Sequence, residues 1–196
     1  MELLYEQNFD ADEEFPPYWA QLWPSSVVLA GAVAAAKPAG ARILELGCGL
    51  GLPSIAAALA GGHVLATDRS ADALTFTSYN AGINGVAVEV GVCDWADPGR
   101  VLERAPWDLV LGADVLYHHG GLADLADLLP RLVGDTGQVW LADPGRPPAA
   151  TFLQVCDVWA ETCGAPEVDR GVTVHRLRPR DRHGVTPSER ARRKMK

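Results

Sequence analysis

The stretch that decides the fold of this chain reads Arg42-Ile43-Leu44-Glu45-Leu46-Gly47-Cys48-Gly49-Leu50-Gly51. Its apolar first half is typical of a buried parallel strand, with Glu45 at the carboxyl end. Three glycines follow at alternate positions, and glycine lets a backbone turn tightly and approach a ligand closely. Residues 52–60 then predict a helix with Pro53 in its first turn, where a missing N–H costs little. Strand, glycine turn and helix together predict a nucleotide-type binding corner at the carboxyl edge of an α/β sheet.

The spacing of these glycines narrows the choice of ligand. A dinucleotide fingerprint reads G-x-G-x-x-G, and Leu52 stands where its third glycine would fall. The phosphate loop G-x-x-x-x-G-K-[ST] is absent from this position. The pattern Glu45-x-Gly47-x-Gly49-x-Gly51 instead resembles motif I of the class I S-adenosylmethionine-dependent methyltransferases. The alternative is a glycine-rich turn that binds no ligand.

Strand and helix patterns alternate on both sides of this corner. The expected helices cover residues 27–36, 52–60, 70–82, a segment before Arg104, an apolar face from Leu122 to Leu132, and residues 149–163. The expected strands cover residues 43–46, 63–67, 86–92, 107–114 and 138–142, followed by an antiparallel pair formed by Val168 and residues 171–177. Ser25 or Ser26 is expected to cap the first helix and Ser70 the third, and residues 134–137 to form a turn.

This order of elements matches the seven-stranded methyltransferase fold that the glycine motif implies. We therefore expect a Rossmann-like, doubly wound α/β sheet of seven strands. It should be mostly parallel, with a C-terminal antiparallel hairpin and helices on both faces. The sequence shows no internal repeat and no linker, which predicts a single domain over residues 1–196.

Composition bounds the class of protein. The chain has 196 residues, 48% of them apolar, which suits one domain with a sizeable core. It contains no apolar run of membrane-spanning length, and its acidic N-terminus does not resemble a secretory signal. The four cysteines form no C-x-x-C pair, which argues against a zinc site or a disulfide framework. A reducing, cytoplasmic location and a monomer without membrane contact are expected.

The net charge of −8 is unevenly distributed. Residues 1–15 carry six acidic side chains and no basic one, which predicts an acidic arm. Residues 176–196 hold nine Lys or Arg and two Asp or Glu, and the basic tail is taken as residues 179–196. A basic tail can contact nucleic acid or an acidic partner, but a solvated terminus is the simpler interpretation.

Acidic residues follow the second and third expected strands. Asp68 lies 17 residues past Gly51, where a carboxylate can accept hydrogen bonds from both ribose hydroxyls. Asp94 and Trp95 follow the third strand, and the methyltransferase resemblance implies that they contact the adenine amino group and flank the ring. Capping of a helix is the structural alternative for either Asp. The residues predicted to bind cofactor are Trp23, Glu45, Gly47, Cys48, Gly49, Gly51, Asp68, Arg69, Asp94, Trp95 and Ala113.

A second group of polar residues follows the fourth strand. Asp114-x-x-Tyr117 places a carboxylate and a phenol at the strand tip, and both are predicted to be catalytic. The neighbouring His118 and His119 lack a third ligand at a recognisable spacing, so we expect no metal.

Three further residues are predicted to bind substrate. Trp19 and Trp140 are candidate aromatic walls for a cationic group, and Asp143 follows the fifth strand. For Trp19, capping of the core is an equally good interpretation.

Within the fold, the chain resembles methyltransferase family 16, which is rich in protein lysine methyltransferases. The resemblance is carried by Leu22-Trp23-Pro24, Glu45 to Gly51, Asp68, Asp94-Trp95 and above all Ala113-Asp114-Val115-Leu116-Tyr117. Asp143-Pro144-Gly145-Arg146 further resembles the branch that acts on the electron-transfer flavoprotein β subunit. The resemblance implies S-adenosylmethionine as cofactor, S-adenosylhomocysteine as product, and a lysine of a protein as substrate. That protein would be the flavoprotein subunit or a ribosomal or translation protein.

Three other functions fit parts of the sequence. A small-molecule N-methyltransferase shares the fold, and a cofactor-binding scaffold would share the glycine motif. A nucleic-acid methyltransferase is disfavoured, because Phe15 replaces the Asp, Asn or Ser that begins the D/N/S-P-P-Y/F/W motif. The acidic body of the chain would also repel phosphate.

Overall fold

The computed structural model describes residues 18–117, 119–164 and 167–180. The acidic arm and nearly all of the basic tail lie outside these residues. The helical elements are η2 (Tyr18–Ala20), α1 (Pro24–Ala36), α2 (Leu52–Leu59), α3 (Ala71–Ile83), α4 (Gly99–Glu103), α5 (His119–Leu132) and α6 (Pro147–Cys156). The strands are β1 (Arg42–Leu46), β2 (His63–Asp68), β3 (Glu89–Val92), β4 (Trp107–Ala113), β5 (Val133–Asp143), β6 (Ala160–Thr162), β7 (Glu167–Asp169) and β8 (Val172–Pro179).

All eight strands belong to one sheet, in the order β3-β2-β1-β4-β5-β8-β6, with β7 also paired to β8. Strands β1 to β5 are parallel, and β8 runs antiparallel to β5. The strand order runs outward from β1 through β2 to β3 on one side and from β4 to β5 on the other. The order therefore changes direction between the neighbouring strands β1 and β4. The loops that leave these two strands diverge, and such a switch point is where open α/β sheets bind ligands.

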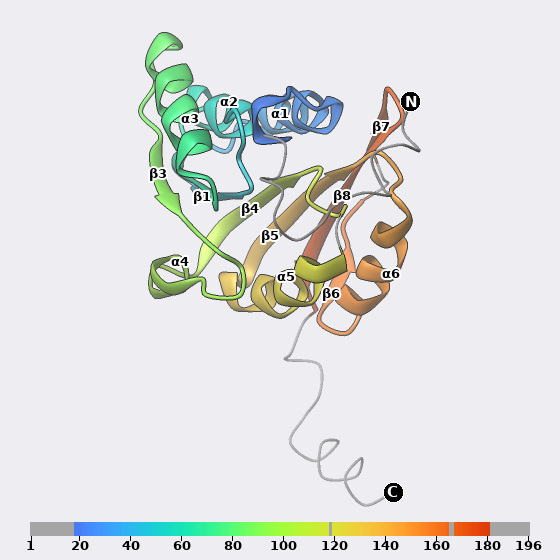
Figure 1. The fold of residues 1–196 in the computed structure, drawn as a ribbon. Helices are drawn as coiled ribbons and strands as arrows, with labels where there is room; N and C mark the ends of the chain where they lie inside the picture. The colour runs from blue at the N-terminus through green and yellow to red at the C-terminus, as the bar shows by residue number, and fades with distance from the viewer. Residues whose placement is uncertain (1–17, 118, 165–166, 181–196) are drawn as a thin grey trace, which may run out of the picture.

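Helices cover both faces of the sheet. Figure 1 shows α1, α2 and α3 on one side and α4, α5 and α6 on the other. Successive strand side chains point to opposite faces, so Ile43 packs with α1 while Leu44 packs with α5 and α6. The β1 positions from Ile43 to Leu46 are all buried, as the apolar run predicts for a central parallel strand.

The expected doubly wound α/β fold is confirmed, with eight strands rather than seven in the described part of the chain. The expected helix over residues 149–163 ends at Cys156, and Ala160–Thr162 forms β6. Residues 160–162 pair with the last part of β8, which is long enough to carry β6 and β7 on the same edge. That pairing is tertiary, and local periodicity does not reveal it.

Two local predictions were wrong. Neither Ser25 nor Ser26 caps α1, because Pro24 already occupies its first turn and Trp23 is the N-cap residue. The Ser26 hydroxyl instead donates to the Trp23 carbonyl at 2.7 Å. Residues 134–137 do not precede β5 but lie inside it, where the register with β4 shifts between Trp107 and Leu109.

Among the described residues, no helix combines the length and the apolarity needed to cross a membrane.

The bulge in β5 predicts a steric limit at Gly137. A Cβ there would lie 2.6 Å from the carbonyl oxygen of Trp107, so Gly137→Ala must push β4 and β5 apart. We expect it to lower the free energy of unfolding by about 1–3 kcal/mol in urea denaturation. Gly31→Ala is the matched control, since nothing lies within 4 Å of that exposed position in α1. It should be stabilising by about 0.5–1 kcal/mol, and equal effects at the two positions would contradict the packing argument.

Candidate functional site

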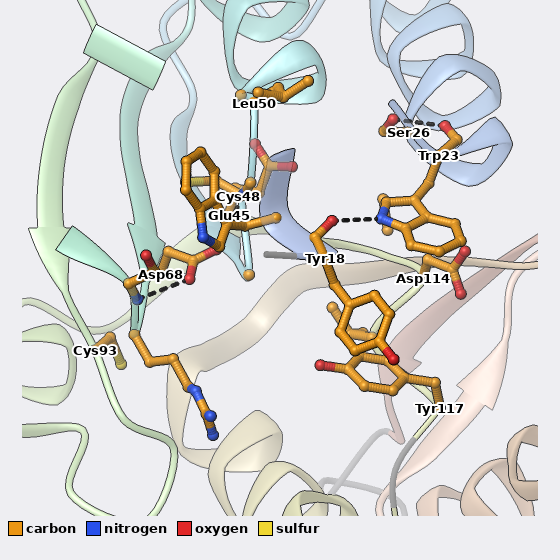
Figure 2. A pocket seen from close by; sticks show the side chains of 18 of the residues that line it. Tyr18, Trp23, Ser26, Glu45, Cys48, Leu50, Asp68, Cys93, Asp114 and Tyr117 are labelled. Atoms are coloured by element: carbon orange, nitrogen blue, oxygen red, sulfur yellow. Dashed lines mark hydrogen bonds between the residues drawn. The ribbon is translucent and has the colours of Figure 1, made fainter. Parts of the chain in front are cut away.

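A cavity of about 520 Å³ opens at the carboxyl ends of β1, β2 and β4, a size typical of ligand-binding pockets. Fourteen of the sixteen predicted site residues line it. They are Trp19, Trp23, Glu45, Gly47, Cys48, Gly49, Gly51, Asp68, Arg69, Asp94, Trp95, Ala113, Asp114 and Tyr117. Figure 2 shows two sides of the pocket, with Glu45, Cys48 and Asp68 on one side and Trp23, Asp114 and Tyr117 on the other.

The glycine loop between β1 and α2 has a left-handed backbone at all three glycines. A Cβ at Gly49 would lie 3.0 Å from the carbonyl oxygen of Trp19, and one at Gly51 would lie 2.6 Å from Thr77. Thr77 in turn donates its hydroxyl hydrogen to the Gly49 carbonyl at 2.9 Å. Both the backbone conformation and the tight approach to η2 and α3 therefore require glycine.

Glu45 is fully buried at the end of β1. Its Oε2 accepts hydrogen bonds from the backbone N–H of Ser54, at 2.9 Å, and from the Ser54 hydroxyl. Its Oε1 is buried with no hydrogen-bond partner among the described residues. Burial raises the pKa of Glu45 to about 8, so the carboxyl is largely protonated at neutral pH. A ligand that brings a cationic or N–H group to this side chain would satisfy Oε1 and favour the ionised form.

Asp68 ends β2 at the far side of the glycine loop. Its Oδ2 accepts from the Gly49 N–H at 3.0 Å and its Oδ1 from the Ser70 N–H at 2.9 Å. The Ser70 hydroxyl caps α3 by accepting from Ala73, as predicted. Asp68 is thus not the capping residue, and each of its oxygens keeps acceptor capacity for a ligand hydroxyl.

Asp94 and Trp95 lie at the pocket wall beyond β3. Asp94 accepts from the Ala96 N–H at 3.0 Å, and α4 begins only at Gly99, so Asp94 does not cap that helix. The Trp95 ring lies within 3.9 Å of a Cβ placed on Gly47 and within 3.4 Å of one placed on Gly121. The Trp95 ring therefore packs close to the glycine loop and forms part of the pocket wall.

Asp114 adopts a left-handed backbone with φ of 57°, which is uncommon outside glycine and marks a strained position. Its backbone N–H donates to the Ala142 carbonyl at 2.8 Å and so ties the turn to β5. The carboxylate is buried and accepts from Arg146 Nε at 2.5 Å, within an ion pair. The strained turn thus aims a carboxylate at the pocket and holds a guanidinium against it.

Aromatic rings surround this carboxylate. Tyr18 and Trp23 have ring centroids 6.4 Å apart, and Trp23 Nε1 donates to the Tyr18 carbonyl at 2.9 Å. Figure 2 shows the Tyr117 phenol close to that of Tyr18, with the Trp23 ring beside Asp114. Although the Tyr117 residue is 54% exposed, partial burial is the main cause that raises its pKa. Its phenol therefore stays protonated at neutral pH.

Two predicted substrate residues do not line the pocket. Trp140 is buried in the core against α1, with the Arg176 guanidinium 4.4 Å from its ring centroid. It lies mid-strand opposite Leu111 of β4, below the carboxyl edge where the pocket opens. Asp143 is also buried, and its Oδ1 accepts from the backbone N–H groups of Gly145 at 2.7 Å and Arg146 at 2.8 Å.

Sequence reasoning did not assign Tyr18 and Arg146 to the site. Tyr18 stands at the last position of the rejected D/N/S-P-P-Y/F/W comparison that starts at Phe15, and Arg146 ends the Asp143-Pro144-Gly145-Arg146 signature. His118 lies outside the described residues, within which no three His, Cys, Asp or Glu side chains gather as metal ligands.

The chain matches a family model described as lysine methyltransferase over residues 13–155. This chain belongs to the lysine methyltransferase family. The match contains the glycine loop, Asp68, Asp94 and Asp114-x-x-Tyr117, so the expected methyltransferase resemblance is confirmed. The predicted cofactor, S-adenosylmethionine, is confirmed with the family.

The named relatives of this chain include lysine methyltransferases, in agreement with the family. It is 36% identical over 137 residues to the electron transfer flavoprotein beta subunit lysine methyltransferase of Danio rerio, covering 67% of this chain and 52% of the relative. It is 36% identical to the protein N-lysine methyltransferase METTL21A of Danio rerio, covering 60% and 57%. The chain thus spans about half the length of the curated relatives it matches.

Solved structures share the fold. The TehB-like methyltransferase of Corynebacterium glutamicum superposes with a TM-score of 0.65 at 20% identity, covering 78% of this chain and 87% of that one. The magnesium protoporphyrin IX methyltransferase of Synechocystis gives 0.63 at 21% identity, covering 80% and 78%. At this identity the likeness describes the fold alone.

The raised pKa of Glu45 predicts how the stability of the ligand-free protein depends on pH. The folded protein keeps a proton up to about pH 8, whereas the unfolded chain loses it near the ordinary value of 4.5. The folded state is therefore stabilised at low pH and loses that advantage as pH rises from about 5 to 8. Glu45→Gln should remove this pH dependence. The change in the free energy of unfolding between about pH 5 and 8 should shrink by several kcal/mol, at roughly 1.4 kcal/mol per pKa unit.

Urea denaturation at three pH values between 5 and 8 measures this difference. Glu161→Gln, on an exposed strand edge, is the control and should follow the wild-type slope. Parallel slopes for Glu45→Gln and wild type would show that Glu45 ionises normally in the folded protein.

Proposed function

We propose that this protein transfers the methyl group of S-adenosylmethionine to a lysine side chain of a protein substrate. The observation that carries the proposal is the acceptor side of the pocket, where the Asp114 carboxylate lies beside aromatic rings. A carboxylate and aromatic faces are the two groups that attract an ammonium ion most strongly. The family and its named relatives support the same chemistry.

The donor side of the pocket fits the cofactor. Asp68 would accept from its ribose hydroxyls, Asp94 and Trp95 would hold its adenine, and the glycine loop would pass close to its amino-acid part. The unpartnered Oε1 of Glu45 favours a positively charged group near that part. When bound, the cofactor supplies a methyl group on a sulfonium, an electrophile whose leaving group is neutral. No general acid is then required.

The acceptor residues have to align the amine and leave its lone pair free. Asp114 would hold the substrate ammonium and fix its direction. Tyr117 would orient the amine by hydrogen bonding, because its raised pKa keeps it from acting as a base at neutral pH. The proton would leave to water or to Asp114 before transfer.

The partner is proposed from the relatives. The electron transfer flavoprotein beta subunit is the first candidate, supported by Asp143-Pro144-Gly145-Arg146 and by the Danio rerio relative. A translation protein is the second, since another relative is an EEF1A lysine methyltransferase 3 of Xenopus tropicalis, 31% identical. We further propose one domain over residues 1–196, a monomer, and a cytoplasmic location. All four cysteines are free, which supports a reducing compartment.

The roles of Asp114 and Tyr117 predict a defect in transfer without a defect in cofactor binding. With methyl-labelled S-adenosylmethionine and a lysate of the source organism, wild type should label one or a few protein bands. Asp114→Asn should lower that rate roughly a hundredfold or more, and Tyr117→Phe by a smaller factor. Both variants should bind S-adenosylhomocysteine normally in calorimetry. The exposed Asp127→Asn is the control.

Asp68→Asn should show the opposite pattern, a defect in cofactor binding. It removes the negative charge at the tip of β2, so we expect at least roughly tenfold weaker binding of S-adenosylhomocysteine, which is about 1.4 kcal/mol.

In the labelling experiment, label that appears only in the small-molecule fraction would replace the lysine assignment by a small-molecule N-methyltransferase. Cofactor binding with no transfer to any fraction would indicate a scaffold.

A further inference from the structure

The guanidinium of Arg146 lies where the two attractions for a substrate cation meet. Its Nε donates to Asp114 Oδ1 at 2.5 Å, and its central carbon lies 5.8 Å from the centroid of the Trp23 ring. A cation held by a carboxylate and by an aromatic face is what the proposed function requires of a bound lysine. We propose that Arg146 occupies the amine site of the resting protein and must be displaced by substrate, which makes it the residue that excludes small free amines.

The backbone and the side chain of Arg146 are held separately. Its backbone N–H is fixed by Asp143 Oδ1 at 2.8 Å, while its side chain reaches across to Asp114. The Asp114 side chain is 5% exposed and that of Arg146 is 33% exposed, so the arginine lies on the solvent side of the carboxylate. The guanidinium can therefore leave Asp114 without any change in the turn that carries it.

A second acceptor lies near the base of this side chain. Asp143 Oδ2 is buried and has no hydrogen-bond partner among the described residues, and it belongs to the carboxylate that already binds the Arg146 backbone. This acceptor is buried, and burial raises the pKa of Asp143, so it does not attract the guanidinium as an exposed carboxylate would. A guanidinium displaced from Asp114 would move toward solvent, where the Arg146 side chain is already 33% exposed.

The ion pair sets a threshold for substrates. An incoming ammonium replaces a cation that is already bound, so the charge on Asp114 is neutralised before and after the exchange. The amine gains little from Asp114 itself, and the rest of the substrate has to supply the binding free energy. A lysine on a docked protein meets this condition, whereas a free amine does not. This inference rests on the proposed function and deepens it, because it explains preference for a macromolecule.

The chain offers a matched control for this contact. Arg176 also stacks on a tryptophan, Trp140, at 4.4 Å, and pairs with a carboxylate, Glu167, at 2.6 Å. Neither Trp140 nor Glu167 lines the pocket, whereas Trp23 and Asp114, the partners of Arg146, both do. Arg176→Gln removes the same kind of interaction without opening the amine site.

The test is calorimetric titration of n-butylammonium, a lysine side-chain mimic, into protein saturated with S-adenosylhomocysteine. We expect Arg146→Gln to bind it at least tenfold more tightly than wild type and Arg176→Gln. Arg146→Lys, which returns a cation to Asp114, should restore the wild-type exclusion. Equal affinity in wild type and Arg146→Gln would overturn the proposal. Weaker binding in Arg146→Gln would also overturn it, since Arg146 would then support the site and not occupy it.

A second measurement uses the native protein and does not depend on the folding of a variant. The Nε–H resonance of Arg146 in nitrogen-15 spectra should shift as n-butylammonium is added at high concentration, because its bond to Asp114 is lost. The Nε–H resonance of Arg176 should stay in place. An unchanged Arg146 signal at saturating amine would contradict displacement.

The outcome for the amine site is separate from the outcome for catalysis. If the proposal and the proposed function both hold, Arg146→Gln should gain methyl transfer to free n-butylamine while wild type labels only protein. Arg146→Gln could bind the amine more tightly while neither wild type nor the variant transfers methyl to n-butylamine or to any protein. That result would support displacement but remove the methyltransferase assignment. Wild-type transfer to n-butylamine as fast as to protein would overturn the exclusion by Arg146 and leave methyl transfer itself intact.

Discussion

The glycine loop passes between η2 and α3 with no side chain at its two points of closest approach, and the rest of the site depends on this close passage. Gly49 lies against the carbonyl of Trp19, and Gly51 lies against Thr77. Because both contacts involve packed neighbours, a methyl group at either position would separate the loop from one of them. The same contact fixes η2 relative to β1, and η2 leads directly into Trp23. The geometry of the donor side therefore sets the position of the aromatic rings on the acceptor side.

Asp114 shows how the fold places a charge in a pocket. Its left-handed backbone is tied to β5 by a hydrogen bond to Ala142, and its carboxylate is paired with Arg146. Transfer of a charged carboxylate from water into the protein is unfavourable, and the ion pair with Arg146 offsets part of that cost. The left-handed backbone and the ion pair together hold the carboxylate in one direction, as the proposed binding of a substrate ammonium requires.

Much of the fold and of the donor side was predictable from sequence, because the signals are local. Glu45, Asp68 and Asp94 each end or follow a strand, and parallel strands bring their carboxyl ends to one edge. Trp140 and Asp143 were misplaced for a different reason. Trp140 pairs mid-strand with Leu111, and the Asp143 carboxylate binds the backbone of its own turn, and local sequence reveals neither depth in the sheet nor such a turn contact. Arg146 reaches the site through its ion pair with Asp114, 32 residues away, which no local pattern records. Tyr18 is placed by its contacts with Trp23, in a segment whose entry into the pocket is a tertiary feature.

The two sides of the pocket are drawn from different parts of the chain. One group of lining residues lies within residues 45–95, and another comprises Tyr18, Trp23 and the segment after β4, to which Arg146 is joined by its ion pair with Asp114. Evolution can therefore exchange one set of segments while it keeps the other. Under the proposed function, changes in the segment after Ala113 would alter the acceptor side while residues 45–95 stay the same. Chimeras between relatives would inherit the same freedom, with η2 as the joint where grafted segments must still fit the glycine loop.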